Sequence, residues 1–403
     1  MATYLSAHAA AAELGVSLPT LYAYVSRGLL RSHVEPGVRT RRYLAEDVWL
    51  LKERARGRRD PAGAARDALY WGMPVLESRL SVIHAGRLYY AGHDAVELAG
   101  RESIEAVAAL LWSAELGALL SEDPVAVEAS AWRSAAALAR RLPPLEGLQL
   151  FLPLGASRDP LAFDLRPEAV RRTGARILRL VAAAAVGASP NLEPVARVLQ
   201  RQWAPRDPAA ARLLDAALVL YADNGLNPSS FTARCVASAG STPYAVVTAG
   251  LAALQGVKHG GACERAAGLL AEMRDVDAAR AMVAARLRRG EAMPGFGHPL
   301  YPDGDPRAAY LLELVAAHRP KSAEVARARA LVEAVHEAMH ERPTIDFAVV
   351  ALCRTLGLPE PAPLLLLGVA RVVGWIAHGL EQYQEGRAIR PRARYAGALP
   401  ALE

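Results

Sequence analysis

The chain has 403 residues, of which 52% are hydrophobic and 22% are charged, with a formal net charge of +6. This composition excludes global disorder and predicts two or three folded units, since single domains commonly have roughly 100 to 200 residues. Three single, widely spaced cysteines exclude a disulfide framework and a paired-cysteine metal site, so we expect a cytoplasmic protein. We expect no secretory signal and no membrane contact, because the N-terminus lacks a basic region before an apolar one and the apolar runs are short.

Residues 1–60 predict a small separate unit that begins with two short helices. Each helix has a serine placed to cap its start and a glycine to end it: Ser6 with Gly15, and Ser17 with Gly28. Two short helices joined by a tight turn are typical of a helix-turn-helix. In a DNA-binding protein the second helix would offer these contacts: Tyr22, Tyr24 and Arg27.

The stretch "HVEPGVRTRRYL" predicts two short strands around a Pro36-Gly37 turn, followed by a helix from about residue 45. Arg39, Arg41 and Arg42 cluster on this predicted wing, and basic residues outnumber acidic ones as contact with phosphates would require. A solvated basic face on a packing unit is the alternative. Residues 4–55 resemble MerR-like, excisionase-type winged helices, which implies contact with DNA. Residues 61–75 form the predicted linker.

The remainder of the chain, residues 76–403, predicts a mainly α body. The stretch "LSVIHAGRLYYAGHDAVELAG" indicates a short hairpin that leads into helices. Ser103 can cap the first long helix, in which apolar residues recur with the spacing of a buried stripe. The absence of regular strand-helix alternation and of a fixed repeat excludes a Rossmann sheet and a solenoid.

Three stretches beyond residue 250 contain candidate catalytic residues. In "KHGGACE", His259 stands beside two glycines, which would let a ligand approach it or would simply end a helix. In "MPGFGHPLYPDGDPRAAY", His298 lies between two turns and precedes Arg307. In "TIDFAVVAL", Asp346 is either a helix cap or a partly desolvated general base. We expect no metal, because the spacing of these residues matches no metal-binding motif.

Two further arginines stand in or near the last apolar stretch. Arg371 lies within an apolar helix pattern, and Arg390 lies beside Pro391. A buried arginine needs a partner, because an unpaired charge in a protein interior is costly. A substrate carboxylate or a structural salt bridge would each supply one.

These stretches, together with "ARVVGWIAHGLEQ" and "IRPRARYAG", resemble the signature stretches of citrate synthases in the same order. The resemblance covers about residues 76–403. It implies an all-α homodimer in which each subunit has a large helical domain and a small one, the latter at roughly residues 228–340. It also implies acetyl-CoA and oxaloacetate, or a similar oxo acid, as substrates, with no cofactor.

The resemblance implies a role for each candidate residue. Asp346 would take a proton from acetyl-CoA, and His259 would stabilise the resulting enol or enolate. His298 would polarise the keto group of oxaloacetate. The residues implied to hold carboxylates are Arg307, Arg371 and Arg390.

The sequence departs from the family pattern at Tyr221, at Cys263, and at Pro299-Leu300, where Arg-Val is common after His298. Tyr221 stands where the family usually has a histidine that contacts oxaloacetate, and Cys263 stands where asparagine is common. A tyrosine hydroxyl can donate a hydrogen bond to substrate, but it is bulkier and neutral. We therefore expect either a condensing enzyme or, alternatively, a weakly active or inactive ligand sensor coupled to DNA binding.

Overall fold

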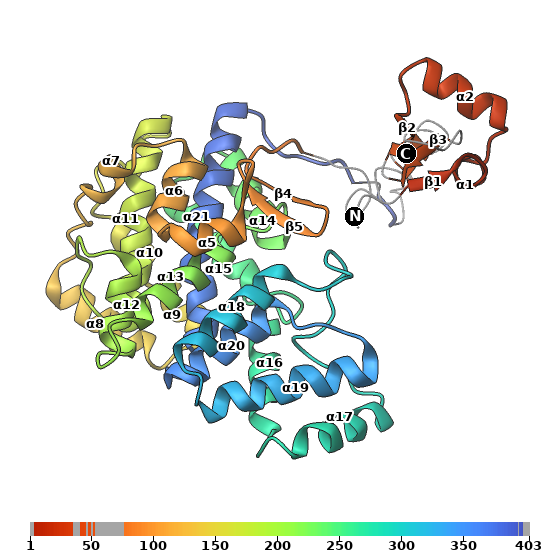
Figure 1. The fold of residues 1–403 in the computed structure, drawn as a ribbon. Helices are drawn as coiled ribbons and strands as arrows, with labels where there is room; N and C mark the ends of the chain where they lie inside the picture. The colour runs from red at the N-terminus through yellow and green to blue at the C-terminus, as the bar shows by residue number, and fades with distance from the viewer. Residues whose placement is uncertain are drawn as a thin grey trace. The chain divides into compact units, whose positions relative to one another are not determined.

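The structure, a computed structural model, describes residues 4–34, 41–45, 47–49, 51–52, 76–393 and 395–397. The chain divides into two compact units, Met1–Ser78 and Arg79–Glu403 (Figure 1). The Pro36-Gly37 turn, Arg39 and the 61–75 linker lie outside the described residues.

The N-terminal unit contains two short helices and a three-stranded antiparallel sheet of order β1-β3-β2. Its elements are β1 (Tyr4–Ser6), α1 (Ala7–Leu14), α2 (Leu18–Ser26), β2 (Ser32–Val34) and β3 (Arg41–Leu44). The predicted helix boundaries are confirmed, because the Ser6 and Ser17 hydroxyls accept backbone N–H bonds and Gly15 is left-handed. Strand β1 was not predicted, because three residues are too short to show alternation.

The N-terminal unit has its own small core, which includes Leu21, Leu30 and Tyr43. Tyr24, predicted to contact DNA, is half-buried against this core, so its ring is used in packing. Tyr22, two residues earlier, is 50% exposed.

The body begins with the predicted hairpin and continues in helices. Strands β4 (Ser81–His84), β5 (Arg87–Tyr90) and β6 (His93–Asp94) form an antiparallel sheet, and Ala85 and Gly86 supply the two positive-φ positions of the first turn. The helices are α5 (Ala95–Arg101), α6 (Ile104–Trp112), α7 (Leu116–Leu120), α8 (Ala129–Ala139), α9 (Pro144–Gln149), α10 (Phe151–Ala156), α11 (Pro167–Val186), α12 (Val195–Trp203), α13 (Ala210–Tyr221), α14 (Pro228–Ser238), α15 (Pro243–Leu254), α16 (Gly261–Glu272), α17 (Ala278–Arg288), α18 (Pro306–His318), α19 (Ala323–Met339), α20 (Ile345–Leu356) and α21 (Ala362–Glu385).

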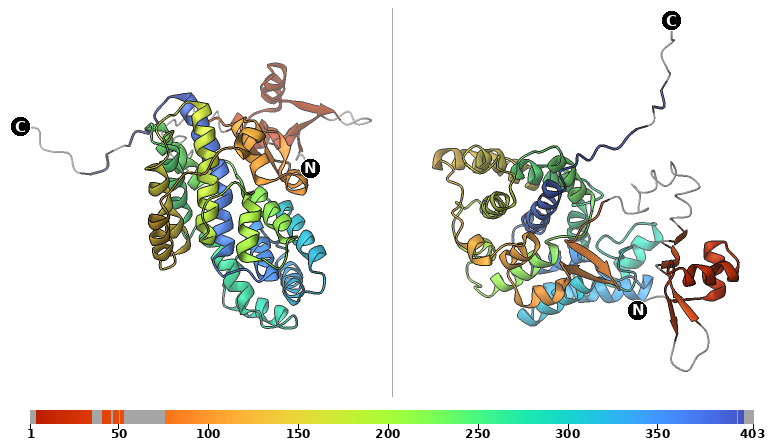
Figure 2. Two further views of the ribbon diagram at one scale, coloured as in Figure 1. Left: turned by 90° about the vertical axis from the view of Figure 1, so that its left-hand side faces the viewer. Right: turned by 90° about the horizontal axis from the view of Figure 1, so that it is seen from above.

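The body has two hydrophobic cores. The larger one surrounds α21, which packs against α6, α11, α13, α14 and α15 (Figures 1 and 2). The smaller one is built by α16, α17, α19 and α20 between residues 266 and 351, and α20 contributes to both. Helices α14 and α15 pack in the larger core, and the smaller core begins at α16, within the predicted small domain of residues 228–340. The lack of a side chain at Gly250 lets α15 lie directly against Trp375 of α21.

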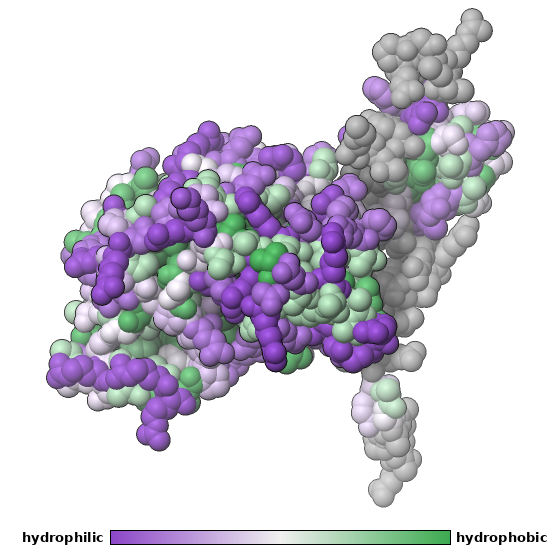
Figure 3. Space-filling model, turned by 60° about the horizontal axis from the view of Figure 1, so that its bottom comes forward, coloured by the Kyte–Doolittle hydropathy of each residue, from purple (hydrophilic) through white to green (hydrophobic). Residues whose placement is uncertain are grey.

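Helix α21 is long and apolar enough to cross a membrane, but its apolar window is entirely buried inside the body. It is therefore the central helix of a folded core. On the face shown in Figure 3, hydrophilic and hydrophobic residues are interspersed.

The partly buried carboxyl of Asp215 makes the stability of this core dependent on pH. Burial, and then the charge of Glu105, raise the pKa of Asp215 to about 7 from 3.8. A raised pKa stabilises the fold below pH 3.8, and this stabilisation is lost as the pH rises through 7. The whole shift corresponds to about 4 kcal/mol. Because Asn can still accept the 2.8 Å bond from the Ile104 N–H, we expect Asp215→Asn to become more stable than wild type as the pH rises from 5 to 8.

Urea denaturation of both proteins at several pH values measures this difference in unfolding free energy. A constant difference across the range would show that Asp215 does not titrate as its burial implies.

Candidate active site

Asp346 lies in the first turn of α20, but its carboxylate does not cap that helix. Thr344 occupies the N-cap position, and the Ile345 N–H donates to Asp305 Oδ2 at 3.0 Å. The Asp346 carboxylate instead accepts hydrogen bonds from the Tyr221 hydroxyl at 2.7 Å and the Cys263 thiol at 3.1 Å. Of the two interpretations of Asp346, the helix cap is therefore wrong in this structure.

The loop that carries His298 is fastened to the segment that leads into α20. Phe296 forms a bridge with Pro343, and the Thr344 N–H donates to the Gly295 carbonyl at 2.8 Å. Gly295 has φ +85°, and a Cβ there would lie 3.0 Å from Phe347. The glycines of the "GFGH" stretch thus allow the backbone conformation of this loop. The bridge between Phe296 and Pro343 brings His298 into the electrostatic range of Asp346.

His298 is held neutral with a defined proton position. Burial, followed by the charge of Arg307, lowers the pKa of His298. Its Nδ1 accepts the Leu300 backbone N–H at 3.1 Å, so in the neutral ring Nε2 carries the proton. The ring can therefore donate a hydrogen bond from Nε2.

His259 lies in the short connection between α15 and α16. The Gly260 N–H donates to the Leu254 carbonyl at 3.0 Å, and a Cβ on Gly260 would overlap that oxygen. The turn itself therefore requires this glycine, whether or not a ligand approaches. Burial and then repulsion by Arg371 lower the pKa of His259 to about 4, so the ring is neutral at pH 7.

Ser229, which the sequence did not indicate, contacts His259. Its Oγ lies 2.9 Å from His259 Nε2 and 2.8 Å from Asn227 Oδ1, and it accepts the Trp375 indole N–H at 3.1 Å. Ser229 has one proton for two acceptors. When it donates to His259 Nε2, the imidazole proton lies on Nδ1 and that atom becomes the donor.

The two internal arginines differ in their partners. Arg307 is 1% exposed and makes two hydrogen bonds to Asp305, at 2.9 and 2.8 Å. Arg371 is 5% exposed, and its buried Nε and Nη1 have no hydrogen-bond partner among the described residues. Arg307 thus has a structural salt bridge, whereas the salt bridge that was one interpretation of Arg371 is not seen at its Nε or Nη1 among the described residues.

Arg390 is the predicted residue that a single chain does not bring to this site. It is exposed, and the neighbouring Ile389 N–H donates to Ser238 Oγ at the end of α14. Ser229 lies nine positions earlier on that helix, about 14 Å away at the rise of an α-helix.

The other predicted residues form one cluster. The charge of Asp346 raises the pKa of both His259 and His298. The charge of Arg371 lowers the pKa of His259, and that of Arg307 lowers the pKa of His298. Tyr221 was expected to contact oxaloacetate. Its hydroxyl donates a hydrogen bond to the Asp346 carboxylate.

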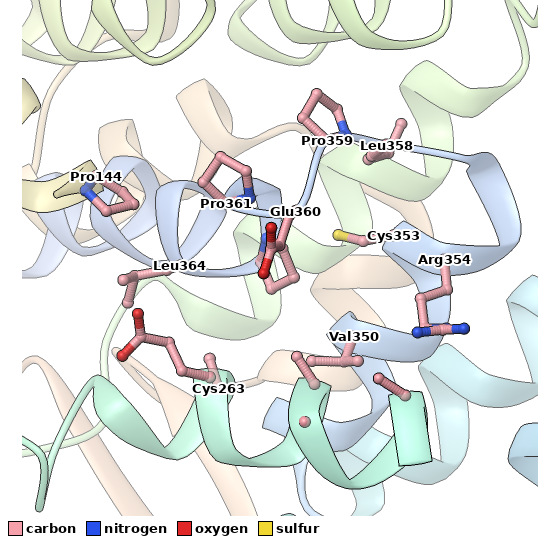
Figure 4. Close-up of a pocket in the computed structure, with 15 residues that line it drawn as sticks. Pro144, Cys263, Val350, Cys353, Arg354, Leu358, Pro359, Glu360, Pro361 and Leu364 are labelled. Atoms are coloured by element: carbon pink, nitrogen blue, oxygen red, sulfur yellow. The ribbon is translucent and has the colours of Figure 1, made fainter. Parts of the chain in front are cut away.

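A cavity of about 700 Å³ lies between α16, α20 and the start of α21 (Figure 4). Cys353, Arg354 and Glu360 are among its lining residues, whereas the predicted catalytic residues are not. Cys263, whose thiol donates to Asp346 Oδ1, also lines the cavity, so the cavity adjoins the cluster around Asp346.

Comparison with known proteins accounts for this arrangement. Residues 69–392 match the family model described as the C-terminal domain of citrate synthase. The chain belongs to the citrate synthase family. The citrate synthase of Haloferax volcanii is 32% identical over 357 residues, which cover 81% of this chain and 94% of the relative. Citrate synthase 2 of Bacillus subtilis is 29% identical over 351 residues, with the same coverage.

Solved structures of citrate synthases have the same fold as the body. The Pyrobaculum aerophilum enzyme superposes with a TM-score of 0.72 at 26% identity, covering 82% of this chain and 92% of that one. The Thermotoga maritima enzyme gives a TM-score of 0.69 at 26% identity, covering 82% and 96%. The mainly helical citrate synthase fold predicted for residues 76–403 is thereby confirmed.

Proposed function

We propose that the body condenses acetyl-CoA, or a related short acyl-CoA, with oxaloacetate to give citrate and CoA. The supporting observation is Arg371, a buried guanidinium near a neutral histidine, two of whose nitrogens have no hydrogen-bond partner in the part of the chain that the structure describes. Such a group is costly in the free protein and is satisfied when an anion binds. A dicarboxylate with a keto group would place a carboxylate on Arg371 and its keto oxygen on the Nε2–H of His298.

The chemistry follows from the described groups. Asp346 takes a proton from the acyl methyl group, and the electron pair moves onto the thioester oxygen, where a hydrogen bond from His259 stabilises it. The carbon then attacks the keto carbon, forming a C–C bond, while the keto oxygen accepts a proton at His298. Water cleaves the thioester, and the sulfur leaves as the CoA thiol. No step calls for a metal or a further cofactor.

Release of thiol from acetyl-CoA by purified protein, with and without oxaloacetate, tests this proposal. We expect release that depends on oxaloacetate. If no release occurs with acetyl-CoA, propionyl-CoA or other oxo acids, the condensing function is wrong and the sensor alternative is preferred.

We also propose that the protein works as a cytoplasmic homodimer. Arg390 supports the dimer, because its neighbour Ile389 is held at Ser238, about 14 Å along α14 from Ser229, where a second copy would be better placed to use this arginine. Light scattering with wild type and with Arg390→Ala would separate dimer formation from a contribution of this arginine to KM.

A second proposed function is DNA binding by the N-terminal unit as a winged helix-turn-helix. A hollow of about 770 Å³ on this unit is lined by Ser26 and by residues of the predicted contact set, Tyr22, Arg41 and Arg42. Two other basic residues are paired with acids: Arg31 with Asp47 at 2.8 Å, and Lys52 with Glu13 at 2.7 Å. The presence of two of the predicted arginines in one hollow makes it the favoured position for a phosphate backbone.

We expect Arg41→Ala/Arg42→Ala to weaken retention of a mixed DNA fragment, and to reduce the slope of log affinity against log salt by about one to two. Lys52→Ala is the control, because its ammonium already has Glu13 as a partner. Gel-shift titrations at three salt concentrations measure both quantities. Absence of any retained fragment at low salt would contradict DNA binding, and a shift that changes with oxaloacetate or acetyl-CoA would favour the sensor alternative.

A further inference from the structure

The two oxygens of the Asp346 carboxylate have different surroundings. Oδ1 accepts both the Tyr221 hydroxyl, at 2.7 Å, and the Cys263 thiol, at 3.1 Å. Within residues 76–393, Oδ2 has no hydrogen-bond partner. One oxygen is therefore anchored, and the other is available to take a proton.

The anchoring donors are buried and come from different helices. Tyr221 ends α13, Cys263 lies in the first turn of α16, and their Oη and Sγ atoms are 3.3 Å apart. Each residue is 1% exposed, so water does not compete for these bonds. Burial and then the charge of Asp346 raise the pKa of both groups, so both remain protonated at neutral pH and can donate.

We infer that Tyr221 and Cys263 are positioning residues that hold Oδ1 of Asp346 and so select Oδ2 as the proton-accepting atom. This inference rests on the proposed condensation. Rotation about the last side-chain bond of an aspartate would otherwise exchange its two oxygens, since this torsion is soft. Two donors on one oxygen fix that torsion, and a base fixed in its reactive geometry avoids a large loss of rate.

Tyr221 and Cys263 together form a clamp on the Asp346 carboxylate. The packing of α13 and α20 gives this clamp a second effect. Helix α20 contributes to both cores of the body, whereas Tyr221 belongs to the larger core, as does Arg371 on α21. The Tyr221 bond therefore ties the Asp346 carboxylate to the core that also carries this arginine. The clamp also accounts for the residues at 221 and 263, which contact each other and share one acceptor.

The test is the steady-state kinetics of Tyr221→Phe, Cys263→Ala and Cys263→Ser as a function of pH. We expect Tyr221→Phe to lower kcat by about 10- to 100-fold with KM for both substrates within about threefold of wild type. We expect its activity to fall off at a higher pH on the acid side, because the lost bond favours the charged carboxylate. Cys263→Ala should lose several-fold in kcat, and Cys263→Ser, which keeps a donor, should recover most of it.

Two matched variants control for the removal of a buried donor. Tyr244→Phe removes a hydroxyl that donates to Asp159 at 2.9 Å, and Cys353→Ala removes a buried thiol from α20. Neither group touches Asp346, and we expect kcat and the pH profile of both variants to match wild type. If Tyr221→Phe keeps the wild-type kcat and pH profile, or changes them no more than Tyr244→Phe does, the positioning role is overturned.

A thermal double-mutant cycle with Tyr221→Phe and Asp346→Asn distinguishes failure of the inference from failure of the proposed reaction. We expect the two shifts in Tm to be non-additive, because the side chains are in contact. Additive shifts would overturn the clamp even if wild type turns over. If wild type showed no turnover but the Tm shifts were non-additive, the condensation and the catalytic role of the clamp would both be overturned. Only the contact between Tyr221 and Asp346 would then stand.

Discussion

Asp346→Asn is expected to lower kcat for oxaloacetate-dependent thiol release by about 1000-fold or more. A positioned general base commonly contributes 100- to 10,000-fold, and an amide nitrogen cannot accept the methyl proton. The amide oxygen can still accept from Tyr221 and Cys263, which now bond to Oδ1. The variant should therefore fold normally and bind oxaloacetate. Thiol release under saturating substrates measures kcat, and thermal unfolding measures the integrity of the fold.

The comparison with Asp305→Asn makes this result specific. Asp305 is also a buried aspartate near α20, but its carboxylate is occupied by Arg307 and by the Ile345 N–H. Its loss should destabilise the fold and disturb Arg307 without removing the base. If Asp346→Asn retained more than a tenth of wild-type kcat, Asp346 would not be the base.

Much of the site could be predicted because its chemistry is concentrated in short stretches. His259, His298 and Asp346 each stand in a local motif, and the structure places both histidines within electrostatic range of Asp346. The glycines beside His259 were interpreted either as room for a ligand or as the end of a helix. Gly260 is required by the Leu254 carbonyl in its own turn, a contact that no local pattern indicates.

The contacts between distant segments could not be predicted. Ser229 meets His259 across 30 positions, and Tyr221 meets Asp346 across 125. The sequence marked Tyr221 as an exception to a family pattern, but only the packing of α13 against α20 shows which group its hydroxyl contacts. The close packing of α15 on Trp375 is a further contact between distant segments that no local pattern indicates.

Arg371→Met is expected to raise KM for oxaloacetate by about 100-fold or more, since losing one partner of a buried charged contact commonly costs about 2 to 5 kcal/mol. The free protein should behave differently. Because Nε and Nη1 of Arg371 have no partner among the described residues, replacing the charge with an apolar side chain should leave the unfolding free energy unchanged or raise it by up to about 2 kcal/mol.

Arg179→Met is the matched control for this prediction. Arg179 is similarly buried, but it donates to the carbonyls of Leu119, Leu120 and Glu122 at 2.7 to 3.0 Å. Its loss leaves those acceptors unsatisfied and should lower the unfolding free energy by about 2 to 4 kcal/mol without raising KM. Urea denaturation without ligand and KM measurements on both variants test the contrast. If Arg371→Met proved as destabilising as Arg179→Met while KM stayed at the wild-type value, Arg371 would be a structural residue. An arginine that binds substrate should instead change KM without lowering the unfolding free energy of the free protein.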